Sequence, residues 1–153
     1  MISASSALVV VGCGFSPPAP PPSAAGGCAG ADSPAPDVIA AAIATLPAGP
    51  WVETARGHAD DCRLQWVLTT VDGGTASSPQ QVLFFDRNTP LGTPTSDPRP
   101  YITVLPSGPE AVLVQYQWLV GDEPNCCPTG LGTVRFRIGA GGGLEALDPI
   151  PDP

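Results

Sequence analysis

The sequence contains no lysine, and its six basic residues are all arginines. With 14 aspartates and glutamates, the formal net charge at pH 7 is −8. A surface with this acidic excess repels phosphate backbones, so we expect no nucleic-acid partner. The acidic residues are spread along the chain rather than gathered in one tail, a pattern typical of a solvated surface.

The chain also lacks any run of about 20 apolar residues, so no membrane-spanning helix is expected. Its most apolar stretch, Ala7–Val11, is short and is followed by Gly12 and Cys13. A short apolar region that ends on a small residue is typical of a signal peptide. We therefore expect residues 1–12 to be a signal peptide. This stretch departs from an ordinary signal in two ways, because no Lys or Arg precedes Cys13 and only twelve residues do; a start further upstream would repair both.

Val10, Val11, Gly12 and Cys13 are similar to a bacterial lipobox, whose last cysteine is diacylated and becomes the first residue of the mature protein. This similarity predicts that Cys13 carries a diacylglyceryl group and that the lipid bilayer is a partner. Two acyl chains are enough for stable anchoring. The alternative is a buried strand with an ordinary cysteine. The proline-rich segment that follows Cys13 disfavours a place in the core.

Residues 14–36 contain seven prolines, six alanines, four glycines and three serines. Such a composition buries too little apolar surface to fold by itself. Together with the lipobox cysteine, residues 13–36 are therefore predicted to be a semi-rigid tether. In the polyproline form, residues 14–36 span at most about 70 Å.

A domain is predicted over residues 37–150, followed by a tail at 151–153 within an acidic, proline-rich end at 148–153. Its first element is a short amphipathic helix that begins at Asp37 and stops at Pro47. The apolar residues of the helix recur at i, i+3, i+4 and i+7 and form one face: Ile39, Ala42, Ile43 and Leu46.

After the helix, apolar residues alternate with polar ones, which indicates strands. In RLQWVLTTV we expect Leu64, Trp66 and Leu68 on one face and Gln65 on the other. The other expected strands are QQVLFFD, a short strand near residues 91–93 after a tight turn, YITVL, AVLVQYQWLV, TVRFRIG and, after the GAGGG turn, LEALDPI. The fold class is therefore α+β, with the helix on an antiparallel sheet of five to six hairpin-linked strands.

Five cysteines are present, and lipidation of Cys13 would leave four for disulfides, which allow three pairings: Cys28, Cys62, Cys126 and Cys127. We favour a Cys28–Cys62 bridge, because it would clamp the tether to the domain. A bridge between the adjacent residues Cys126 and Cys127 would add little stability, although it would be a redox-labile element.

Few residues point to catalysis. The only histidine, His58, lies in HADDC with Asp60 and Asp61, and we read this stretch as a turn rather than a metal site. No GxSxG or CxxC motif occurs, and GAGGG lacks the GK[ST] of a phosphate-binding loop. We therefore expect no catalytic residues, no metal and no cofactor. Two alternatives remain: an extracytoplasmic hydrolase that uses carboxylates, and a soluble cytosolic protein with reduced thiols.

Several motifs in order, AIATLP with Trp51, CRLQW, PQQVLFFD, LGTPT, VLVQYQW, TVRFRI and LDPIP, resemble the LppP/LprE lipoprotein family of mycobacteria and related actinobacteria. The resemblance covers roughly residues 37–151. It implies a lipoprotein anchored on the outer face of the plasma membrane, and it implies no catalytic residues. The expected role is non-enzymatic, with an envelope protein or a small ligand as partner. Three aromatic residues fall on strand faces and are expected in the core: Trp66, Tyr116 and Trp118. The alternative is that a partly exposed tryptophan among them lines a ligand groove.

Overall fold

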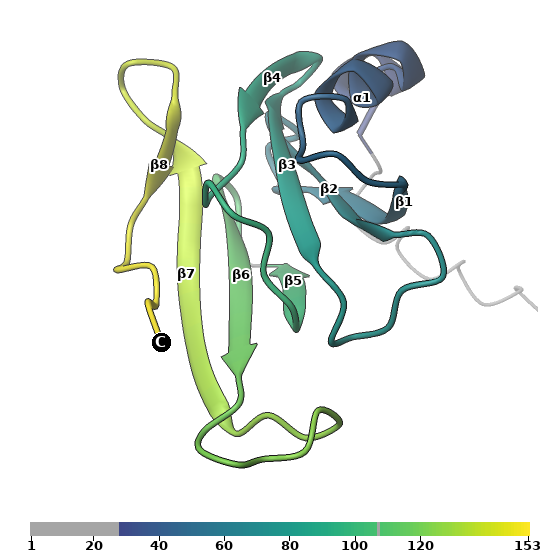
Figure 1. The fold of residues 1–153 in the computed structure, drawn as a ribbon. Helices are drawn as coiled ribbons and strands as arrows, with labels where there is room; N and C mark the ends of the chain where they lie inside the picture. The colour runs from purple at the N-terminus through teal and green to yellow at the C-terminus, as the bar shows by residue number, and fades with distance from the viewer. Residues whose placement is uncertain (1–27, 107) are drawn as a thin grey trace, which may run out of the picture.

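The structure is a computed structural model, and it describes residues 28–106 and 108–153. Figure 1 shows how the helix and the strands are arranged. The elements are, in order, a 3₁₀ turn at Gly30–Asp32, α1 (Pro36–Ile43), β1 (Trp51–His58), β2 (Leu64–Val71), β3 (Gln80–Asp86), β4 (Thr89–Gly92), β5 (Ile102–Pro106), β6 (Ala111–Trp118), β7 (Gly130–Ile138) and β8 (Leu144–Ala146). The predicted α+β class is confirmed.

The strands form two antiparallel sheets, with the orders β1-β2-β3-β4 and β5-β6-β7-β8. The expectation of one sheet with five to six strands was therefore wrong in the number of sheets and strands. The chain leaves the first sheet after β4 through residues 93–101, which include Pro94, Pro98 and Pro100. Proline cannot donate to a strand ladder, so this segment carries the chain across to the second sheet.

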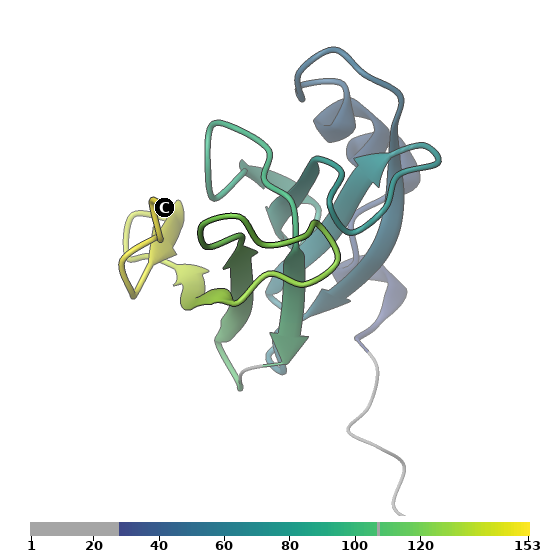
Figure 2. The same cartoon turned by 60° about the horizontal axis from the view of Figure 1, so that its bottom comes forward.

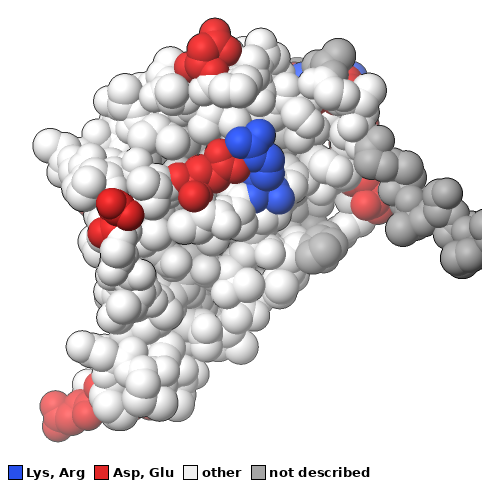
Figure 3. All heavy atoms as spheres, turned by 90° about the vertical axis from the view of Figure 1, so that its right-hand side faces the viewer, with Lys and Arg blue, Asp and Glu red and all other residues white. Residues whose placement is uncertain are grey.

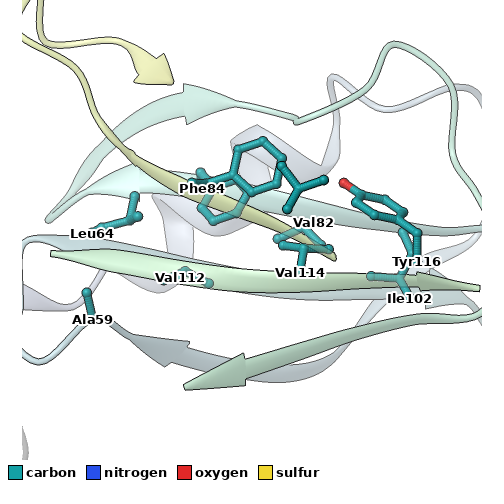
Figure 4. Packing of buried hydrophobic residues seen from close by; sticks show 10 residues of the cluster. Ala59, Leu64, Val82, Phe84, Ile102, Val112, Val114 and Tyr116 are labelled. Carbon is teal, nitrogen blue, oxygen red and sulfur yellow. The ribbon is translucent and has the colours of Figure 1, made fainter. Parts of the chain in front are cut away.

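The two sheets pack face to face around one apolar core. Figure 4 shows Val82 and Phe84 of β3 pointing toward Val114 and Tyr116 of β6. The ring of Phe84 also lies against that of Phe136 in β7, with centroids 5.3 Å apart. Leu64, which the alternation in the sequence places on one face with Trp66 and Leu68, lies in this core together with Val112 and Val134.

A second, smaller core lies on the opposite face of the first sheet. Helix α1 packs Ile39 and Ala42 against Val67, Leu83 and Phe85. Helix, first sheet and second sheet thus form three layers, which Figure 1 shows from the edge. Because both faces of β2 and β3 are covered, Gln65 is only 3% exposed, although it lies on the face opposite Leu64, Trp66 and Leu68.

The sequence predicted the last hairpin correctly, since β8 pairs with β7 from Phe136 to Ile138. It did not predict β1. This edge strand lacks the alternation of an amphipathic strand and contains Gly57, yet it pairs with β2 along its length. The helix is also shorter than expected: it ends at Ile43, and a turn carries the chain to Pro47.

Two tryptophans lie over glycines of the neighbouring strand. Trp66 pairs with Gly57 and Trp118 pairs with Gly130. An added Cβ at Gly57 would lie 2.6 Å from the indole of Trp66. Glycine at these two positions therefore leaves the space that each indole fills.

Gly130→Ala is expected to lower the free energy of unfolding by about 1–3 kcal/mol, because its methyl group would overlap the indole of Trp118. Gly141→Ala is the matched control, because a Cβ there meets nothing within 4 Å. Urea unfolding followed by tryptophan fluorescence measures both changes. Equal midpoints for the two variants would show that the indole moves aside without cost.

Candidate functional site

Of the five cysteines, Cys13 lies outside the described residues, and the other four form two bridges. Cys28 is joined to Cys62 with a Cα–Cα distance of 5.4 Å and a sequence separation of 34. Cys28 stands at the start of the described chain, and Cys62 lies in the turn between β1 and β2. This bridge, which we call the clamp, ties the segment before the helix to the first sheet.

The turn that holds Cys62 is fixed by hydrogen bonds. The amide of Ala59 donates to the carbonyl of Leu64 (2.9 Å), and the amide of Cys62 donates to the carbonyl of Ala59 (3.0 Å). Cys62 has a φ of 61°, in the left-handed region. The buried side-chain amide of Gln65 donates to the Cys62 carbonyl (2.7 Å). This role of Gln65 was not predicted from the sequence; a polar side chain among the apolar residues of a strand was the available signal.

Further contacts dock the segment that follows Cys28. Asp32 pairs with Arg87 at 3.4 Å, and the amide of Ala35 donates to Oδ1 of Asn88 at 2.8 Å. Pro34 is buried. Figures 1 and 2 place the start of the described chain on the opposite side of the molecule from the C-terminus.

His58 lies beside the clamp rather than in an Asp-rich site. One ring nitrogen of His58 and the sulfurs of Cys28 and Cys62 all lie within 4.8 Å of one another. Within residues 28–106 and 108–153, this is the one group of three or more His, Cys, Asp or Glu side chains close enough to share an ion. Asp60 and Asp61, which the sequence groups with His58, are not part of it.

The second bridge joins Cys126 to Cys127 in the loop between β6 and β7, and both residues are exposed. The hydroxyl of Tyr101 donates to the carbonyl of Asn125 at 2.7 Å, which ties this loop to the start of β5. Glu123 braces the same loop by accepting from the Thr129 hydroxyl and from the backbone amides of Val120 and Thr129. These hydrogen bonds lower the pKa of Glu123; the bond from the Thr129 hydroxyl contributes most, and the bonds from the two backbone amides come next.

Several cavities open to the surface beside this loop, along the second sheet and under α1. One of about 360 Å³ adjoins Cys126 and Cys127 and includes Tyr101 and Gln117. Another of about 200 Å³ includes Trp118 and Arg99. A third, of about 290 Å³, lies under α1 and is lined mostly by apolar groups, including Ala42 and Leu83.

The largest of the described cavities, about 400 Å³, contains two carboxylates, Asp61 and Glu110, and two arginines, Arg63 and Arg137. The guanidinium of Arg63 donates to both carboxylate oxygens of Asp86, and Arg137 pairs with Glu145 at 2.9 Å. Oδ1 of Asp61 accepts from the Arg63 amide at 2.9 Å and so completes a turn. These contacts assign structural roles to Asp61 and to both arginines.

Two carboxyl groups elsewhere have lowered pKa values. The pKa of Asp148 falls to about 2, chiefly because the Arg135 side chain donates to it and because the Arg135 amide donates as well. The hydrogen bond from Arg63 lowers the pKa of Asp86. A general acid needs a raised pKa, so neither group suits that task at neutral pH.

Most arginines of this domain are paired with a carboxylate. Five of the six form ion pairs with aspartate or glutamate: Arg56, Arg63, Arg87, Arg135 and Arg137. Arg99 instead donates to the carbonyl of Pro151 and lies over the ring of Tyr116. Figure 3, which views the right-hand side of Figure 1, shows its main group of blue atoms directly beside red ones on a mostly uncharged face. This face offers no basic patch.

These features define a small α+β domain of two packed antiparallel sheets with two disulfide bridges. Among the described residues, no helix has the length and apolar character needed to cross a membrane. A family model described as LppP/LprE lipoprotein matches residues 56–141. The chain belongs to the LppP/LprE lipoprotein family.

Relatives from Mycobacterium bovis and from two strains of Mycobacterium tuberculosis, provisionally named lipoprotein LppP, are 52% identical to this chain over 144 residues. Each alignment covers 92% of this chain and 82% of the relative. No solved structure matches the chain. The family resemblance stated from the sequence is confirmed.

Proposed function

We propose that this protein is anchored by diacylglyceryl-Cys13 to the outer face of the plasma membrane and that its domain is a non-enzymatic binding module of the cell envelope. Membership of a lipoprotein family is the observation that carries this proposal. The proposed partner is an envelope protein or a small ligand.

The clamp supports a spacer role for the segment before the domain. Because Cys28 is tied to Cys62, the proposed tether between the lipid and the domain would consist of residues 14–27. In the polyproline form these residues reach at most about 43 Å. The domain would therefore work within a few tens of ångströms of the membrane.

The cavities support binding more than catalysis. The cavity beside Trp118 combines an indole and a guanidinium, and the cavity under α1 is mostly apolar. Such surfaces orient and hold a ligand. In the largest cavity, by contrast, Asp61 caps a turn and both arginines are already paired, so a carboxylate hydrolase is the weaker alternative.

Cys13→Ser is expected to abolish membrane anchoring, because it removes the thiol that accepts the lipid. The native protein, extracted with detergent from its own cells, is expected to begin at Cys13 and to carry a diacylglyceryl group by intact mass. Cys13→Ser protein is expected to lack the lipid and to move from the detergent phase to the aqueous phase. A wild-type chain of full length with no lipid would contradict the proposal.

A further inference from the structure

We propose that the clamp is a redox-gated metal site: when the Cys28–Cys62 bridge is reduced, its two thiolates and His58 bind a thiophilic ion of the Zn²⁺ class. The two sulfurs and one ring nitrogen of His58 already lie within 4.8 Å of one another. With Zn–S bonds of about 2.3 Å and Zn–N bonds of about 2.0–2.1 Å, a tetrahedral ion holds its ligand atoms about 3.5–3.8 Å apart. The two sulfurs, now bonded to each other, would therefore move apart after reduction to accept the ion.

The hydrogen bond of His58 suits a ligand. Its Nδ1 lies 2.9 Å from the carbonyl of Ala59, so Nδ1 carries the proton and donates it. Nε2 is then left with a free lone pair. Metal-binding histidines usually donate their other N–H to a carbonyl or carboxylate, which fixes the tautomer and the ring orientation. Ala59 is itself buried and hydrogen-bonded to Leu64, so the accepting carbonyl belongs to a rigid turn.

Cys62 is equally well placed. The carbonyl of Cys62 accepts from the buried side-chain amide of Gln65, and the backbone amide of Cys62 donates to the carbonyl of Ala59. Reduction of the bridge would leave both of these contacts intact. The Cys62 sulfur would therefore stay near His58. The Asp32–Arg87 ion pair and the hydrogen bond between Ala35 and Asn88 would position the segment that follows Cys28, and the ion would supply the constraint that the reduced bridge has lost.

The redox step requires a dithiol reductant. Two electrons and two protons from the reductant convert the Cys28–Cys62 bridge into two thiols, and the two thiols of the reductant become a disulfide. Binding of the divalent ion then displaces one proton from each thiol. Three protein ligands leave a fourth position for water. The cysteines are half-buried and His58 is exposed, so an ion can reach the site.

The chemistry of the ligands selects the ion. Thiolate and imidazole favour Zn²⁺ and similar thiophilic ions over Mg²⁺ and Ca²⁺, which take oxygen ligands. The bound ion would join residues 28 and 62 again by coordination. In reducing conditions it would thus replace the covalent bridge and keep the tether fixed at the same point of the domain.

The test uses the full chain with Cys13, Cys126 and Cys127 replaced by serine, so that Cys28 and Cys62 are the only thiols. Reduced with a phosphine and titrated with Co²⁺, this protein is expected to develop thiolate-to-cobalt charge-transfer absorption with one ion per chain. Zn²⁺ is expected to displace the Co²⁺. The oxidised protein is expected to show no such band.

His58→Gln in the same background is expected to weaken Zn²⁺ binding by at least about tenfold. Asp60→Asn is the matched control, because it removes a neighbouring carboxylate that lies outside the cluster. Circular dichroism of each reduced protein monitors folding, and Zn²⁺ is expected to raise the urea midpoint of the parent more than that of His58→Gln. Equal affinity of His58→Gln and the parent would overturn the proposal, as would the absence of a charge-transfer band in the reduced protein.

Discussion

Phe84→Ala is expected to lower the free energy of unfolding by about 3–5 kcal/mol, as for other fully buried aromatic residues. The Phe84 side chain has no exposed surface, and it fills the space between the two sheets. Its ring lies 5.3 Å from that of Phe136 on the opposite sheet. Removal of the ring leaves a cavity that neither sheet can close, because each is held by its own hydrogen-bonded ladder. Urea unfolding followed by tryptophan fluorescence measures the loss.

A double-mutant cycle decides whether the two sheets share one core. Phe84→Ala and Phe136→Ala together are expected to show a coupling energy of about 0.5–1.5 kcal/mol, the range for aromatic pairs in contact. Phe85→Ala is the matched control: it is the next residue of β3 and is equally buried, but it faces α1. Phe85→Ala and Phe136→Ala should be additive within about 0.5 kcal/mol. Strong coupling of Phe85 with Phe136 would contradict the three-layer arrangement.

The strands inside the sheets were predictable because their side chains alternate. Val134 and Phe136 face the core while Arg135 and Arg137 face solvent, as the period of two indicates. Gln65 breaks this rule: it is a polar residue of an alternating strand, yet it is 3% exposed, and its side-chain amide donates to the carbonyl of Cys62. Alternation tells which residues share a face, but only the packing of distant segments determines whether that face is covered.

The division into two sheets was not predictable from the strands alone. A strand pattern such as YITVL reads the same whether β5 joins the sheet of β4 or begins another. Residues 93–101 determine which sheet β5 joins, because three prolines and Tyr101, whose φ of 57° is left-handed, redirect the chain there. β1 was missed for a different reason. Its burial follows its pairing with β2, and its own residues carry no periodic signal.

The candidate site was visible from sequence only in part. The cysteines are evident from their type, and the position of Cys28 before the domain made its bridge to Cys62 the favoured pairing. The place of His58 was not evident, because neighbours in sequence suggested Asp60 and Asp61 as its companions. The turn at residues 59–62, with Cys62 in the left-handed region, folds back and brings the cysteine rather than the carboxylates to the imidazole.

Replacing Cys28 and Cys62 together by serine is expected to lower the free energy of unfolding of the oxidised protein by about 3–4 kcal/mol. The bridge spans a sequence separation of 34, so its removal frees a long loop in the unfolded chain. The bridge between the adjacent residues Cys126 and Cys127 constrains almost no loop. Its double serine variant is therefore the matched control, with an expected loss of about 1 kcal/mol or less.

The free energy of unfolding that is lost when Cys28 and Cys62 are replaced also shows how firmly other contacts hold the segment before α1. The 32–87 ion pair is about half-exposed, and such pairs contribute about 0–1 kcal/mol. These contacts position the segment, but they are too weak to replace the constraint of the bridge. Chemical unfolding of both double variants, without reductant, gives the comparison. Equal unfolding midpoints for the two double serine variants would mean that the Cys28–Cys62 bridge adds no stability. In that case the burial of Pro34 and the packing of α1 would hold the segment by themselves.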